Sequence, residues 1–203
     1  SVPGIFAQTP KPDVSERLAA AADTYFAGHP HKALEQYITI SKETKNKDAF
    51  LNAAFIALEQ GNPKQAVDIA TAGYTIYPQD EDLTEFVADA YLADGQFFNA
   101  EHFFSMLEAG GERSEFWLIN LARAQLGMGE TKLAKQNLQR AAAGQGHTAL
   151  ANYLLGQIFE QEKNWTAAAK AYSAAIDYDH QFTEARVHYA LALEKSKQYN
   201  EAY

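Results

Sequence analysis

The sequence contains no cysteine, and this absence removes several classes of chemistry. Disulfide frameworks, thiol nucleophiles and cysteine-ligated zinc sites all require the missing residue. Long apolar runs are absent as well, because charged or amide residues interrupt each candidate well short of the ~20 residues that a membrane-spanning helix needs. We therefore expect a soluble chain without direct membrane insertion, either cytoplasmic or a bacterial periplasmic or envelope segment.

Positive charge is scarce: 17 Lys and Arg stand against 26 Asp and Glu, which gives a formal net charge of −9. An acidic surface repels phosphate backbones, so nucleic acid is not an expected partner. The GxSxG, Walker and HExxH motifs are missing, and the His and Asp residues near turns lack the spacing of zinc ligands. We therefore expect no enzyme, no cofactor and no metal site.

What is present is globular composition, with 203 residues of which 47% are hydrophobic. This is enough material for a sizeable core. Residues 1–12, SVPGIFAQTPKP, stand apart because they hold three prolines and a glycine and show no helical period. We interpret them as a proline-rich linker or a processed N-terminus.

Residues 13–203 repeat themselves with a period of 34 residues. Two series of small residues recur at this interval, and the second series lies twelve residues after the first in every copy. A series of glycines falls between them, where a helix would have to stop, and Lys163 takes that place in the next copy. Apolar spacings of three and four residues on both sides indicate two short amphipathic helices in each copy. The three series are Ala54, Ala88, Ala122 and Gly156; Ala66, Ala100, Ala134 and Ala168; and Gly61, Gly95 and Gly129.

This pattern resembles the tetratricopeptide repeat, whose signature places small and aromatic residues at these intervals. The copy from Ala149 matches best, with Gly156, Phe159, Ala168 and Tyr172. The resemblance implies an all-α fold, a right-handed superhelical α-solenoid of antiparallel helix pairs. About five and a half repeats would form a single solenoid, and the last copy would stop just after its second helix begins. The expected copies are 14–46, 47–80, 81–114, 115–148, 149–182 and a partial 183–203.

The resemblance also implies a function, namely a non-enzymatic scaffold that binds a partner peptide or helix in a concave groove lined by the first helices. The family's best-known ligand mode grips a C-terminal carboxylate with Lys, Asn and Arg side chains. That clamp is missing, because Leu51, Phe55, Glu85 and Asp89 stand where cations or amides would be required. The expected partner is instead a protein or peptide with apolar anchors and some positive charge.

The groove candidates combine aromatic anchors with acidic and polar side chains of the expected first helices. Asp82, Glu85 and Asp89 are three and four residues apart, so they share one helical face. In a structural alternative, carboxylates such as Asp82 favour the start of a helix, and Asp89 pairs with Arg123 one copy later. The candidates are Phe55, Glu59, Asp82, Glu85, Asp89, Phe116, Asn120, Arg123, Tyr153, Gln157 and Glu160.

The copy from Glu81 departs from the others on its second helix. Phe98, His102 and Met106 are spaced by four along a face that other copies fill with charged and amide residues. Such a convex stripe is a candidate contact for another protein or for a second copy of the chain. The alternative function is therefore an assembly or spacer module of a larger membrane-associated, secretion or envelope protein that self-associates here. In the other interpretation, the loop after this helix or the N-terminal segment covers the stripe.

Overall fold

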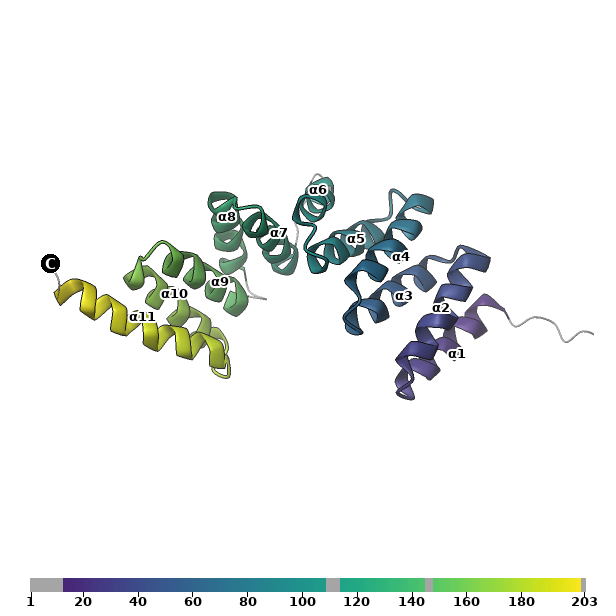
Figure 1. The fold of residues 1–203 in the computed structure, drawn as a ribbon, viewed down its shortest axis with the longest axis horizontal. Helices are drawn as coiled ribbons and strands as arrows, with labels where there is room; N and C mark the ends of the chain where they lie inside the picture. Colours follow the sequence, from purple (N-terminus) through teal and green to yellow (C-terminus); the bar gives the residue numbers. More distant parts are fainter. Residues whose placement is uncertain (1–12, 109–113, 145–147, 202–203) are drawn as a thin grey trace, which may run out of the picture. The chain divides into compact units, whose positions relative to one another are not determined.

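A computed structural model of the protein describes residues 13–108, 114–144 and 148–201. This part of the chain forms α-helices joined by short turns and contains no strand, which confirms the all-α class (Figure 1). None of its helices is long and apolar enough to cross a membrane. The helices are α1 (Val14–Phe26), α2 (Pro30–Thr44), α3 (Lys47–Glu59), α4 (Pro63–Ile76), α5 (Glu81–Ala93), α6 (Phe97–Glu108), α7 (Glu115–Gly127), α8 (Thr131–Ala142), α9 (Thr148–Gln161), α10 (Trp165–Tyr178) and α11 (Thr183–Glu201).

The odd-numbered helices begin where the 34-residue period places the start of each copy. The sole difference of register among them is α9, which begins at Thr148, one residue before the expected start. Helices that follow one another along the chain pack together in pairs, as an α-solenoid requires. These contacts join α1 to α2, α2 to α3, α3 to α4, α6 to α7, α7 to α8, α8 to α9, α9 to α10 and α10 to α11.

The chain divides into two compact units, the first ending at Ala90 and the second starting at Tyr91. The first unit holds α1 to α4 and most of α5, and the second holds the remaining helices. One continuous solenoid over residues 13–203 stays a prediction.

The turns inside the helix pairs confirm the role expected for the glycine series. Gly61, Gly95 and Gly129 have φ values of 70°, 73° and 80°, a backbone region that favours glycine. Gly28, with φ 83°, makes the same turn in the first pair, and Lys163 adopts it with φ 57°. A side chain in this region costs about 1–2 kcal/mol, so Lys163 is held there by the helices on either side.

The helices start at residues suited to that position. Pro30 and Pro63 occupy the first turns of α2 and α4, where a missing N–H leaves no hydrogen bond unmade. Asn62 Oδ1 accepts a hydrogen bond from the Gln65 N–H at 3.3 Å and so caps α4. Asn164 caps α10 through the Ala167 N–H at 3.2 Å.

The small residues lie in the core, which is why they recur. The alanines of both series are fully buried, as is the ring of Tyr172. At Gly156 the fit is tightest, because a Cβ atom there would lie 2.4 Å from Tyr172 Cε1. The mixture of small and large residues in this copy is therefore a packing arrangement between α9 and α10.

The last helix differs from expectation. α11 continues through Lys197, which corresponds to Lys163 one period earlier, so no second helix of the last copy begins there. The residue after Lys163 is Asn164, an effective helix cap, whereas Gln198 follows Lys197 and glutamine is not a favoured N-cap. The expectation that the last copy reaches its second helix is therefore wrong.

Candidate protein-binding surface

In the first unit, α3 and α5 enclose an open hollow of about 320 Å³. The hollow brings together four of the predicted groove residues, Phe55, Asp82, Glu85 and Asp89. This volume is at the small end for ligand sites, so the hollow suits one or two side chains of a partner better than a whole cofactor. We call it the α3–α5 hollow; its lining is Leu51, Asn52, Phe55, Asp82, Glu85, Phe86 and Asp89.

Phe55 is the aromatic anchor point of this hollow. Its side chain is 43% exposed, and its ring lies edge-on to Tyr25 with centroids 6.5 Å apart. A half-exposed aromatic ring beside carboxylates presents both apolar area and negative charge to a partner.

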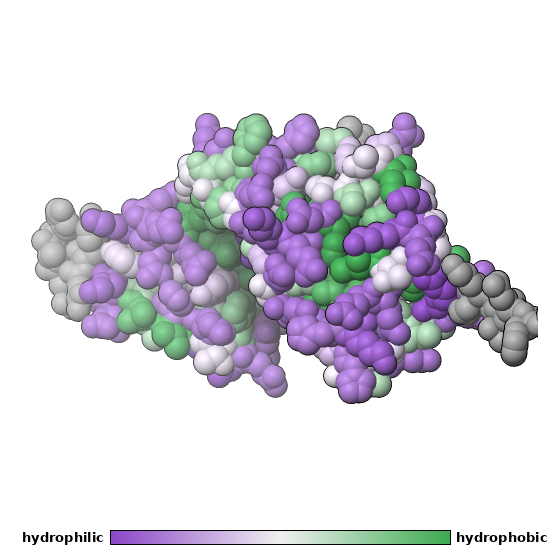
Figure 2. Space-filling model, turned by 45° about the vertical axis from the view of Figure 1, so that its right-hand side comes forward, coloured by the Kyte–Doolittle hydropathy of each residue, from purple (hydrophilic) through white to green (hydrophobic). Residues whose placement is uncertain are grey.

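On the face of the molecule seen in Figure 2, hydrophobic patches interrupt a largely hydrophilic surface.

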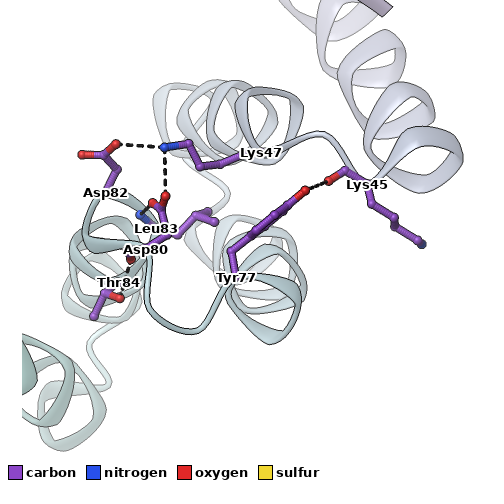
Figure 3. A network of polar contacts seen from close by, with 7 residues as sticks. All are labelled: Lys45, Lys47, Tyr77, Asp80, Asp82, Leu83 and Thr84. Atoms are coloured by element: carbon purple, nitrogen blue, oxygen red, sulfur yellow. Dashed lines mark hydrogen bonds and ion pairs between the residues drawn. The ribbon is translucent and has the colours of Figure 1, made fainter.

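Two aspartates at the start of α5 have a structural task (Figure 3). Lys47 Nζ lies 2.9 Å from Asp80 Oδ2 and 3.1 Å from Asp82 Oδ2, which ties α3 to α5. The Leu83 N–H donates to Asp80 Oδ1 at 3.0 Å. Burial raises the pKa of Asp80, but the Leu83 N–H and the Lys47 ammonium outweigh it, so the pKa lies below its usual value. Asp82 remains exposed at the rim of the hollow.

The turn before α5 is fixed in the same region by Tyr77, whose hydroxyl donates to the Lys45 carbonyl at 2.7 Å (Figure 3). This bond connects the end of α4 to the turn between α2 and α3.

Glu59, the remaining groove candidate of the first unit, accepts a hydrogen bond from the Tyr25 hydroxyl. This bond raises the pKa of Tyr25, and burial adds to the effect. The ring of Tyr25 also touches that of Phe26, which is largely exposed, at a centroid distance of 5.4 Å. Sequence reasoning missed this aromatic pair because the register of the shorter first copy was uncertain by one residue.

In the second unit, three groove candidates lie on α7. Phe116 is exposed at the start of the helix, and Arg123 Nη1 donates to Asn120 Oδ1 at 3.2 Å. Asn120 is only 4% exposed. A partner would therefore touch Phe116 and Arg123 and reach little of Asn120.

The three candidates on α9 lie in an intramolecular network. Gln157 Nε2 donates to the Tyr153 hydroxyl at 3.1 Å. Glu160 Oε2 accepts from the Tyr172 hydroxyl at 2.7 Å and lies 3.0 Å from His188 Nδ1. Burial raises the pKa of Tyr172, and the Glu160 carboxylate raises it further. These contacts join α9 to α10 and α11, so Glu160 has a clear role in holding the last three helices together.

Sequence reasoning missed His188 as the partner of Glu160. The two residues are 28 positions apart, which is not a multiple of the period, so comparing repeats does not pair them. The ring of His188 also lies against those of Tyr153 and Tyr172, with centroids 5.7 Å and 5.3 Å away.

The convex stripe of α6 is exposed. Phe98 is 75% exposed, and Met106 and His102 are exposed beside it. The His102 ring lies edge-on to Phe103 at a centroid distance of 5.6 Å. The segments proposed to cover the stripe, residues 1–12 and the loop after α6, fall largely outside the described residues.

Within the described side chains, no group of three or more His, Asp or Glu residues is placed to hold a metal ion. The surface features of the described residues include the α3–α5 hollow and the exposed apolar residues of α6 and α11. These are features of a binding surface for another polypeptide.

Comparisons with known proteins agree with the helix-pair architecture. Residues 119–182 match the family model of the tetratricopeptide repeat. No curated protein matches the sequence significantly. Among solved structures, MamA 41-end from Desulfovibrio magneticus RS-1 superposes with a TM-score of 0.76 at 12% identity, covering 86% of this chain and 99% of that one.

A thermophilic TPR protein from Thermus thermophilus superposes with a TM-score of 0.67 at 18% identity, covering 89% of this chain and 99% of that one. A chain of the APC/C hetero-tetramer Cut9-Hcn1 gives a TM-score of 0.71 at 15% identity, covering 91% of this chain and 37% of that one. At these identities the likeness shows the fold.

The fold and the exposed surfaces define an α-solenoid of stacked helix pairs. The family match over residues 119–182 and the superposed structures agree that this is the fold of tetratricopeptide repeat proteins. Proteins with this fold are generally non-enzymatic scaffolds for protein interactions, which use the surface that stacked repeats present.

Proposed function

We propose that this protein is a scaffold that binds a segment of a partner protein in the α3–α5 hollow. The observation that carries the proposal is the composition of the hollow, in which exposed Phe55 stands beside Asp82, Glu85 and Asp89. The partner segment carries an apolar anchor together with Lys or Arg.

The two features of the hollow contribute differently to binding. Full burial of an apolar side chain contributes about 1.5–3 kcal/mol, so contact with Phe55 and Phe86 supplies most of the affinity. The carboxylates attract a cationic segment and exclude an acidic one, which affects the association rate and the choice of partner more than the affinity. Binding should therefore weaken as the salt concentration rises.

The proposal is tested with a library of random peptides selected against the intact protein. The selected peptides should share a bulky apolar residue near Lys or Arg. In calorimetric titrations, Phe55→Ala and Glu85→Lys should each lower their affinity by about tenfold or more, whereas Phe98→Ala on α6 should not. Selected peptides that bind all three variants like the wild type would refute binding in the hollow.

A second candidate function is self-association through the convex stripe, which the 75% exposure of Phe98 favours. Light scattering of the wild type and of Phe98→Glu tests it. Loss of a dimer in the variant supports the stripe as the contact, and a monomeric wild type removes this function.

A further inference from the structure

The outer face of α11 is apolar and is large enough for a second helix to pack on it. α11 packs on α10 through Ala192 and Tyr189, which lie in one cluster with the buried ring of Tyr172. On the opposite side of α11, Val187 is 55% exposed and Leu191 is 47% exposed. Ala190, which lies between these two residues in the sequence, is also exposed, and so is Leu193.

The equivalent positions in the earlier copies of the repeat indicate what kind of contact this face of α11 can make. Ala190 corresponds to Gly156, which packs against Tyr172 of the second helix of its pair, and the same position is fully buried in the earlier copies. Leu193 corresponds to Phe159, which borders the same contact. The face therefore keeps the small residue that allows close approach of a helix, to axes about 8 Å apart. Within the described chain, α11 contacts α10 and no later helix.

We propose that the occupant of this face is α11 of a second copy, packed antiparallel about a two-fold axis at Ala190. In that arrangement Arg186 of one copy faces Glu194 of the other, and Val187 faces Leu193. Each pairing occurs twice because a two-fold interface is self-complementary. Opposite charges thus face each other on both sides of the alanine.

The distribution of charge favours α11 as the meeting place. The whole chain carries a net charge of −9, so two copies repel each other over most of their surface. Around the whole of α11 up to position 197, the exposed charged residues are three cations, Arg186, Lys195 and Lys197, and two carboxylates, Glu184 and Glu194. Two acidic copies therefore meet here without local repulsion, and salt screens the remaining charges beyond about 8 Å at physiological ionic strength.

A single introduced cysteine tests the pairing directly, because the natural chain has none. Antiparallel helices that cross at Ala190 bring the two copies of this residue within the Cα distance of a disulfide, about 4.4–6.8 Å. Under mild oxidation of the intact protein, Ala190→Cys should form a covalent dimer. The matched control is Lys195→Cys, which is also exposed but points about 140° away around the helix.

Charge reversal in the Ala190→Cys protein tests the orientation. Glu194→Arg alone should slow cross-linking by about tenfold, since it places two cations together across the interface. Adding Arg186→Glu should restore the rate, because the reversed charges again face each other. The two positions are eight residues apart on one helix, too far for a direct pair within one copy.

The expected result is a dimer in sedimentation of the wild type, with fast cross-linking of Ala190→Cys that Phe98→Glu leaves unchanged. Cross-linking of Ala190→Cys no faster than that of Lys195→Cys would overturn the proposal. A double charge reversal that fails to restore the rate would overturn the antiparallel arrangement. A monomeric wild type would overturn the two-fold pairing itself.

Discussion

The contact between Gly156 and Tyr172 leads to a prediction about the substitution Gly156→Ala, in which core packing and helix propensity have opposite effects on stability. Gly156 lies inside α9, where alanine normally stabilises a helix by about 1 kcal/mol relative to glycine. A Cβ atom here would lie 2.4, 2.6 and 2.8 Å from three ring atoms of Tyr172. These distances are far inside van der Waals contact, so either the ring or the helix must move.

The Tyr172 ring has little room to move. It is fully buried, and its hydroxyl donates to Glu160 at 2.7 Å. Overpacking of a filled core costs about 1–3 kcal/mol, which exceeds the gain in propensity. Gly156→Ala should therefore destabilise the protein by about 1 kcal/mol.

Urea unfolding measures this change, followed by circular dichroism and by the fluorescence of the two tryptophans, Trp117 and Trp165. The matched control is Tyr172→Leu, because the preceding copy combines Ala122 with Leu138 at the corresponding positions. In the Leu background, Gly156→Ala should become neutral or stabilising, which gives a coupling energy of about 1–2 kcal/mol. A Gly156→Ala protein as stable as the wild type, or an additive double mutant, would refute the packing argument.

Two further predictions concern single residues. Lys163→Gly should stabilise the protein by about 1 kcal/mol in urea unfolding because it relieves a positive φ, and Gly129→Ala should destabilise it by a similar amount. Asp80→Asn should cost stability above about pH 4, where the lowered pKa keeps the native carboxylate charged beside Lys47. The difference in urea midpoint between wild type and Asp80→Asn should vanish as the pH falls through that lowered pKa, and a constant difference would contradict this.

The sequence predicted the helix pairs well because their positions follow from sterics. Only small residues allow two helices to approach, and only a few residues make the turn between them, so both leave a period that can be read directly. The end of α11 was mispredicted because Lys197 repeats Lys163. The difference depends on the next residue, Asn164 in one copy and Gln198 in the other, and so on one capping hydrogen bond.

The candidate surface was predictable in part. Phe55, Glu85 and Asp89 share a hollow because the helical spacing and the 34-residue period place them on the same face of α3 and α5. The pairing of Glu160 with His188 was not predictable, because it depends on how α11 crosses α9 and follows no period. Contacts between non-equivalent positions require the packed structure.

Two neighbouring positions of the repeat differ in how much their residues vary, and this difference distinguishes a packing position from a candidate recognition position. The position of Gly156 holds only glycine or alanine in every copy from Ala54 onward, and it is fully buried in every copy before Ala190. The position that follows it by one residue holds Phe55, Asp89, Arg123, Gln157 and Leu191 in successive copies. No packing rule demands such a range of chemistry at one position of a repeat. An aromatic residue on α3 and a carboxylate on α5 make the two sides of the hollow chemically different, and under the proposed function the apolar anchor of a partner would contact the first and its cation the second.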